Sequence, residues 1–187
     1  MGSICMRVSK GWLFAIRDDP GLWTEVCLND IKYPPTNSAL CQLVKRASLA
    51  SSLVVRDARR LGLDHAKFSF IFNGLPRLRH LHLHGPPAAY AFYPDKYAGG
   101  YPTALTSLSL TGIISQGNDN LLGNLLRSSR NTLRDLSLVG TRELVQDQFA
   151  VLLPNLTTLK LQCSPDQSIQ GVIHYMVAPL ALFVVDR

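Results

Sequence analysis

A short leucine pattern, LxxLxL, returns along this chain at nearly constant intervals and is first complete within LPRLRHLHLHG. Complete copies recur as LTSLSL, LRDLSL and LTTLKL, and weaker copies flank them on both sides. The last apolar position of successive copies falls at Leu28, Val55, Leu83, Leu110, Leu138, Leu161 and Val185. The steps between these marks are 27, 28, 27, 28, 23 and 24 residues. Such regularity over seven copies indicates a repeated structural unit.

Each copy alternates apolar with polar residues, which is typical of a short β-strand with one buried face. The shortest step of 23 residues, less six for the pattern, leaves 17 residues for a return to the next strand. Three returns place apolar residues at helical spacing, namely residues 38–48, 118–129 and 168–176. Residues 85–102 are rich in Pro, Gly and Tyr, so we expect a loop there.

One strand and one return cannot bury an apolar face alone, so successive units must stack against one another. Prolines stand just before several of the expected strands, where they stop a preceding helix and favour extended chain. They are Pro76, Pro102, Pro154 and Pro179. The sequence therefore predicts an α/β fold in which the strands form a curved parallel sheet lined on its outer side by helices.

These residues resemble leucine-rich repeats, with LPRLRHLHLHG and LPNLTTLKLQC the closest copies. The resemblance covers residues 22–187 and implies one domain, a leucine-rich-repeat solenoid of about six to seven repeats. The asparagine that usually follows the last leucine is replaced by His84, Thr111, Val139 and Gln162. The repeat is therefore similar to a divergent type.

Within each copy the leucines should point into the solenoid, while the residues between and just after them line its concave surface. A wide surface of this kind suits polar contacts with a protein partner. The side chains expected to bind the partner are Arg56, Arg79, His80, His82, His84, Ser107, Ser109, Arg134, Asp135 and Lys160. For any one of them, the alternative is the ordinary solvated side of a sheet.

The spacing of His80, His82 and His84 also raises the question of a metal site, because imidazoles at i and i+2 on one strand face can share zinc, copper or nickel. The adjacent strands supply no carboxylate or thiol at the facing positions. We therefore expect a polar recognition face with no metal and no other cofactor.

The sequence contains no GxSxG, GxxxxGK[ST] or HExxH motif and no paired metal-binding cysteines. Ser, His and Asp all occur, but their presence alone does not make a triad. We expect no catalytic residues and classify the chain as a binding protein rather than an enzyme.

The four cysteines show no paired spacing, which fits a reducing compartment. The opening residues hold only the short apolar run WLFAI, too short for a signal peptide or a membrane span. We therefore expect a soluble protein of the cytoplasm or nucleus with no membrane partner.

The net charge of +6 is concentrated at the N-terminal end, since residues 1–80 hold 12 of the 19 Lys and Arg but 6 of the 13 Asp and Glu. These charges are scattered and form no basic run. A solvated surface is the better interpretation, and a nucleic-acid partner is not expected.

The N-terminal residues raise a second resemblance. They match V-[CS]-[KR]-x-W followed by P-x-L-W, with Val8, Ser9, Lys10, Trp12, Pro20, Leu22 and Trp23 at the matching positions. This pattern resembles the closing half of an F-box, without the opening LP-containing helix. From the residues alone, Trp12 and Trp23 could instead cap the open end of the solenoid.

An F-box followed by leucine-rich repeats resembles the fungal-type substrate receptors of SCF ubiquitin ligases. The resemblance implies a partial F-box-like helical cap at residues 1–23, in which Val8, Trp12, Leu22 and Trp23 bind a Skp1-type adaptor. The repeats would then bind a protein substrate. With half of the F-box, adaptor binding should be weak or absent. The alternative is a leucine-rich-repeat scaffold unconnected to ubiquitin.

Overall fold

The computed structural model describes residues 20–28, 35–56, 61, 63, 65–85, 100–112, 121–141, 153–163 and 182–186. The strands in these ranges are β1 (Glu25–Leu28), β2 (Ser52–Arg56), β3 (His80–His84), β4 (Ser107–Thr111), β5 (Asp135–Thr141), β6 (Thr158–Cys163) and β7 (Leu182–Asp186). The helices are α3 (Asn37–Arg46), α4 (His65–Gly74) and α5 (Leu121–Ser128), preceded by the 3-10 helix η1 (Pro20–Leu22). The predicted helix at 168–176 and all but the ends of the predicted loop at 85–102 lie outside the described residues.

The strands form a single seven-stranded sheet in chain order, and every neighbouring pair is parallel. The register aligns the marks read from the sequence: Leu28 pairs with Val55, and the series continues through Leu83, Leu110, Leu138 and Leu161 to Val185. The predicted repeat spacing and the α/β fold with a parallel sheet are thus confirmed.

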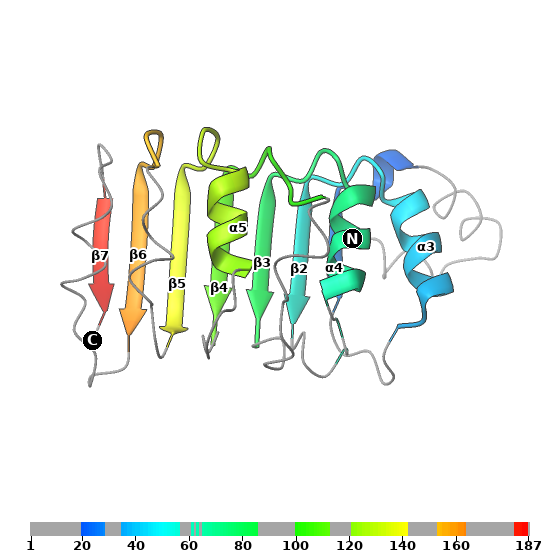
Figure 1. Cartoon of the computed structure of the whole chain (residues 1–187), viewed down its shortest axis with the longest axis horizontal. Helices are drawn as coiled ribbons and strands as arrows, with labels where there is room; N and C mark the ends of the chain where they lie inside the picture. The colour runs from blue at the N-terminus through cyan, green and yellow to red at the C-terminus, as the bar shows by residue number, and fades with distance from the viewer. Residues whose placement is uncertain are drawn as a thin grey trace.

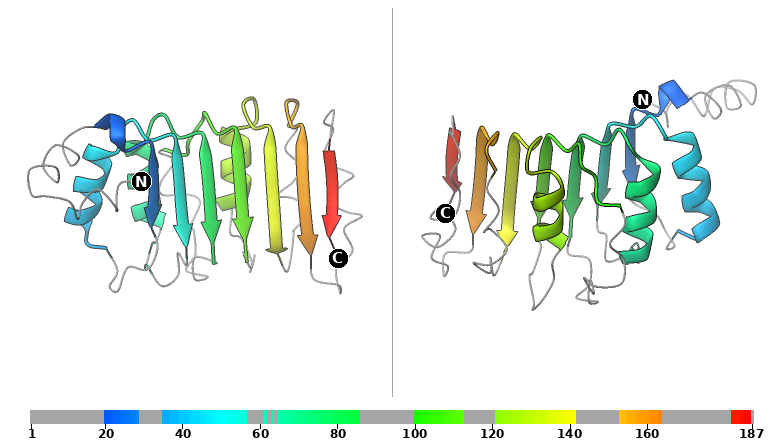
Figure 2. Two further views of the ribbon diagram at one scale, coloured as in Figure 1. Left: turned by 180° about the vertical axis from the view of Figure 1, so that it is seen from behind. Right: turned by 45° about the horizontal axis from the view of Figure 1, so that its top comes forward.

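The helices α4 and α5 lie in front of the strands in Figure 1, and α3 lies next to α4, beyond the β1 edge of the sheet. The view from behind in Figure 2 shows the strands with no described helix over them. The molecule therefore has a helix-covered face and, across the described part of the chain, a face formed by the strands alone.

Leucines fill the space between the sheet and the helices. Along β3, Leu81 and Leu83 are 2% and 0% exposed, whereas the histidines that alternate with them are at least partly exposed. The first leucine of each complete pattern is buried as well, at Leu78, Leu105, Leu133 and Leu156. These leucines bury apolar area that a single repeat could not cover, so the repeats stabilise one another.

Helix α3 confirms the helix predicted at residues 38–48. It begins after Thr36, whose hydroxyl oxygen accepts a hydrogen bond from the Ala39 amide at 3.2 Å, and Leu40 and Ala47 are buried in the core. Helix α5 likewise lies within the helix predicted at 118–129 and buries Leu125 and Leu126. The remaining helix, α4, was not predicted; it buries Phe68, Ile71 and Phe72.

A tight turn leads into several strands and sets where each strand starts. The Leu78 amide donates to the Leu75 carbonyl at 3.1 Å, and the Leu156 amide donates to the Leu153 carbonyl at 3.2 Å. Pro76 and Pro154 follow the first leucine of these turns, which is the position where the fixed φ of proline favours a turn. The turns bring the residues just before the strands to one edge of the sheet.

Candidate functional site

The strand face without helices, called the open face, is mostly polar. Its members on β1 to β6 are Glu25, Cys27, Ser52, Val54, Arg56, His80, His82, His84, Ser107, Ser109, Thr111, Asp135, Ser137, Val139, Thr158, Lys160 and Gln162. All of them are exposed or partly exposed. A broad, shallow array of hydroxyls, imidazoles and charges suits hydrogen bonding to another macromolecule better than enclosing a small substrate.

The strand register brings most of the predicted partner-binding residues together. His80 pairs with Ser52 and Ser107, and Asp135 lies one strand further along the same row. The central row holds His82, Ser109 and, two strands on, Lys160. Arg56 and His84 pair in the third row.

The histidines form the most closely packed group on the open face. The rings of His82 and His84 stack with centroids 4.3 Å apart and an interplanar angle of 22°. The Nε2 atom of His82 is buried and has no hydrogen-bond partner among the described residues. A buried nitrogen without a hydrogen-bond partner is uncommon in folded proteins.

Burial lowers the pKa of His82 below its usual value of 6.5, and the nearby positive charges of His84 and Arg56 lower that pKa further. His82 is therefore held in its neutral form near neutral pH. A neutral imidazole can accept a hydrogen bond at one nitrogen and donate one at the other.

A metal does not fit this group well. Both register neighbours of His82, Val54 and Ser109, lack the nitrogen, thiolate or carboxylate ligands that zinc takes. In the part of the chain that the structure describes, no group of three or more His, Cys, Asp or Glu residues could hold a metal ion.

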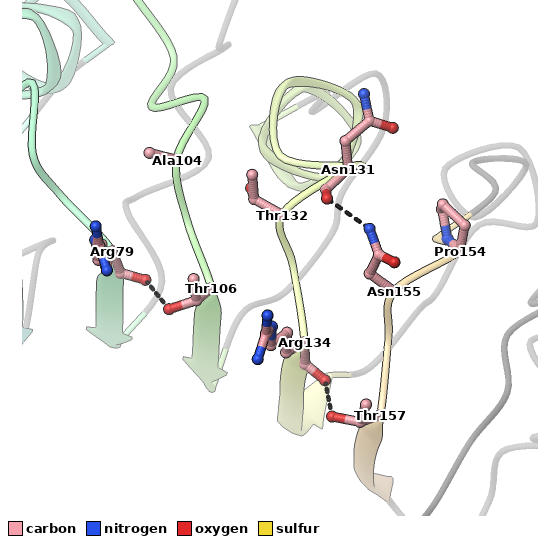
Figure 3. A pocket seen from close by; sticks show the side chains of 9 residues that line it. All are labelled: Arg79, Ala104, Thr106, Asn131, Thr132, Arg134, Pro154, Asn155 and Thr157. Atoms are coloured by element: carbon pink, nitrogen blue, oxygen red, sulfur yellow. Dashed lines mark hydrogen bonds between the residues drawn. The ribbon is translucent and has the colours of Figure 1, made fainter.

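Two predicted residues, Arg79 and Arg134, lie elsewhere. Each comes just before the first residue of its strand, at the edge where the strands start, and both line a pocket of about 620 Å³ (Figure 3). This pocket, called the amino-edge pocket, is lined by Arg79, Ala104, Thr106, Asn131, Thr132, Arg134, Pro154, Asn155 and Thr157. The Asn155 Nδ2 atom donates to the Asn131 carbonyl at 2.6 Å across one side of it.

Sequence reasoning missed Asn131, Thr132, Asn155 and Thr157 as lining residues. A usable signal exists for Thr157, which occupies the same repeat position as Arg79 and Arg134, directly after the first leucine of the pattern. Asn131 and Asn155 lie in turns. The leucine pattern does not specify how closely these turns approach the edge of the sheet.

The residues expected to bind an adaptor are only partly described. Val8 and Trp12 lie outside the described residues. Leu22, at the end of η1, is 57% exposed, whereas Trp23 is partly buried and packs against the core. Leu22 is thus available for contact, and Trp23 joins the N-terminal segment to the repeats.

Comparison with protein families, with curated proteins and with solved structures found no match to this chain. Among the helices described, none is long and apolar enough to cross a bilayer.

Proposed function

We propose that this chain is a leucine-rich-repeat protein that binds a protein substrate on its open face and serves as the substrate-recognition subunit of an SCF-type ubiquitin ligase. The observation that carries the binding role is the open face itself, a mostly polar surface built from β1 to β6 with no described helix over it. In solenoid proteins such faces are the usual binding surfaces.

The polar groups of the open face favour a partner rich in hydrogen-bonding side chains. Ser107 and Ser109 offer hydroxyls, Asp135 and Lys160 offer opposite charges, and the exposed His80 offers an imidazole.

The ubiquitin link depends on the F-box-like residues at the N-terminus. The exposed Leu22 supports this role, since an apolar side chain next to the first strand can contribute to an adaptor interface. In the proposed complex, Val8, Trp12 and Leu22 contact the Skp1-type adaptor, Trp23 supports them from the core, and the other ligase subunits transfer ubiquitin.

Titration calorimetry with a purified Skp1-type adaptor tests the ubiquitin link. We expect weak or undetectable binding to residues 1–187, and tight binding when an LP-containing F-box helix is placed before them. Trp12→Ala should weaken the tight complex by at least about tenfold, as loss of an aromatic anchor does. If the extended chain is folded and still does not bind the adaptor, the protein is instead a scaffold without a connection to ubiquitin.

A further inference from the structure

The residue that follows the first apolar residue of each repeat has a constant backbone role at the amino edge of the sheet. Its members among the described residues are Thr24, Ser51, Arg79, Thr106, Arg134 and Thr157. Each carbonyl from Thr24 to Arg134 accepts two amides from the next repeat; the Arg79 oxygen, for example, accepts from Thr106 N at 2.8 Å and Ser107 N at 3.0 Å. The repeats are joined at this edge by a continuous ladder.

Hydroxyl side chains at this position strengthen the same ladder. Ser51 Oγ donates to the Thr24 carbonyl at 3.5 Å, Thr106 Oγ1 to the Arg79 carbonyl at 3.3 Å, and Thr157 Oγ1 to the Arg134 carbonyl at 3.1 Å. Arg79 and Arg134 make the backbone bonds of the ladder but place a guanidinium where the other repeats have a small hydroxyl. The architecture does not require an arginine at either position.

The two arginines come from alternate repeats and face the same pocket. Figure 3 shows them on either side of Thr106, and strands two apart in a sheet are separated by about 10 Å. None of the nine residues that line the amino-edge pocket is acidic. Asp135 follows Arg134 in sequence but belongs to the open face, in a row with Ser107 and Thr158.

The rest of the lining is compatible with an anion. The backbone carbonyls of Arg79 and Arg134 would repel an anion, but each already accepts hydrogen bonds from two backbone amides and one threonine hydroxyl. The exposed Asn131 side chain adds an amide donor at the rim. The positive charges of Arg79 and Arg134 are therefore not neutralised by the other residues that line this pocket.

We propose that the amino-edge pocket binds a phosphate-class oxyanion, clamped between the guanidiniums of Arg79 and Arg134. Two planar guanidinium forks supply more donors than a single carboxylate accepts, whereas a tetrahedral phosphoryl group can accept from both. The anion is either free phosphate or a phosphorylated side chain of a bound protein. The site lies at the edge of the sheet and is independent of the open face, so it stands whether or not the proposed function is correct.

The test is calorimetric titration of the whole chain at constant ionic strength, with inorganic phosphate, with a short Gly–Ala peptide carrying one phosphoserine, and with its unphosphorylated twin. Arg79→Gln and Arg134→Gln should each weaken binding of the phosphorylated probe by about tenfold. Arg77→Gln and Arg130→Gln remove the same charge from exposed sites outside the pocket lining and should change affinity less than about twofold.

The probes distinguish the source of the anion. Binding of both phosphate and phosphopeptide indicates a free anion as occupant, and binding of the phosphopeptide alone indicates a phosphorylated side chain. Arg79→Lys keeps the charge but loses the fork, so an intermediate affinity is expected. The proposal is overturned if neither phosphorylated probe binds, if the unphosphorylated twin binds equally well, or if the control variants weaken binding as much as the pocket variants.

Discussion

At the residue scale, His82 makes the stability of the fold depend on pH. Its pKa is lowered in the folded chain relative to the usual 6.5, so as the pH falls below 6.5 the unfolded chain takes up a proton before the folded chain does. Above pH 6.5, His82 therefore contributes nothing to stability. As the pH falls from 6.5 towards the lower pKa of the folded chain, His82 increasingly destabilises the fold, and below that pKa the destabilisation no longer grows.

We predict that the free energy of unfolding decreases as the pH falls below 6.5, and that the decrease is smaller in His82→Gln. Urea unfolding at a series of pH values measures this free energy for both chains. His80→Gln is the matched control, because His80 is exposed on the same strand, and it should leave the pH dependence closer to that of the parent chain. An identical fall in the parent chain and His82→Gln would show that His82 is not the group responsible.

Residue alternation accounts for how much of the open face was predictable. In a strand, successive side chains point to opposite faces, so fixing the leucines inward fixes His80, His82 and His84 outward. The rule ends where the strand ends. Arg79 stands just outside β3, and its position in the amino-edge pocket depends on the turn before the strand and on the neighbouring repeats, neither of which the alternation describes.

At the element scale, α4 shows why one helix was missed. Its Phe68, Phe70 and Phe72 alternate as in a strand, and aromatic residues favour strands. The structure uses the helical spacing instead: Phe68, Ile71 and Phe72 are buried, and Phe70 is 41% exposed. The local sequence permits either structure, and packing favours the helix, because α4 contacts α3 and places Phe68, Ile71 and Phe72 in the core.

The contact between α3 and α4 gives a second prediction. A Cβ added at Gly74 would collide with the Val44 side chain on α3, so Gly74→Ala should destabilise the fold by about 1–3 kcal/mol. Gly123, inside α5, has room for a Cβ, whose nearest neighbour would be the Arg127 guanidinium at an ordinary contact distance of 3.7 Å.

Gly123→Ala is thus the matched control and should stabilise the chain by about 0.5–1 kcal/mol through its higher helix propensity. Denaturant unfolding compares the two variants. Equal effects of the two substitutions would contradict the close packing of α3 on α4.

At the scale of the whole molecule, stability is shared between neighbouring repeats. Leu108 is 1% exposed and pairs with Leu81 on one side and Leu136 on the other. We predict that Leu108→Asp, which buries an unpaired charge, costs more than about 4 kcal/mol and exposes both flanking repeats.

Amide hydrogen exchange should therefore show lost protection in β3 and β5 as well as in β4. Ser109→Asp places the same charge one residue away on the open face and should cost less than about 0.5 kcal/mol. Loss of protection confined to β4 would mean that the repeats are not coupled.

In the proposed function, the protein partner binds the open face and not the helix-covered face. Site-specific photo-crosslinking in cells tests this most directly, with the photoreactive residue placed at Ser109 in the centre of the open face or at Phe70, which is exposed on α4 on the opposite side. We predict discrete adducts from Ser109 that are lost when Lys160→Glu reverses a charge in the same row, and none of the same mass from Phe70. Adducts from Phe70 that equal or exceed those from Ser109 would show that the partner does not bind the open face.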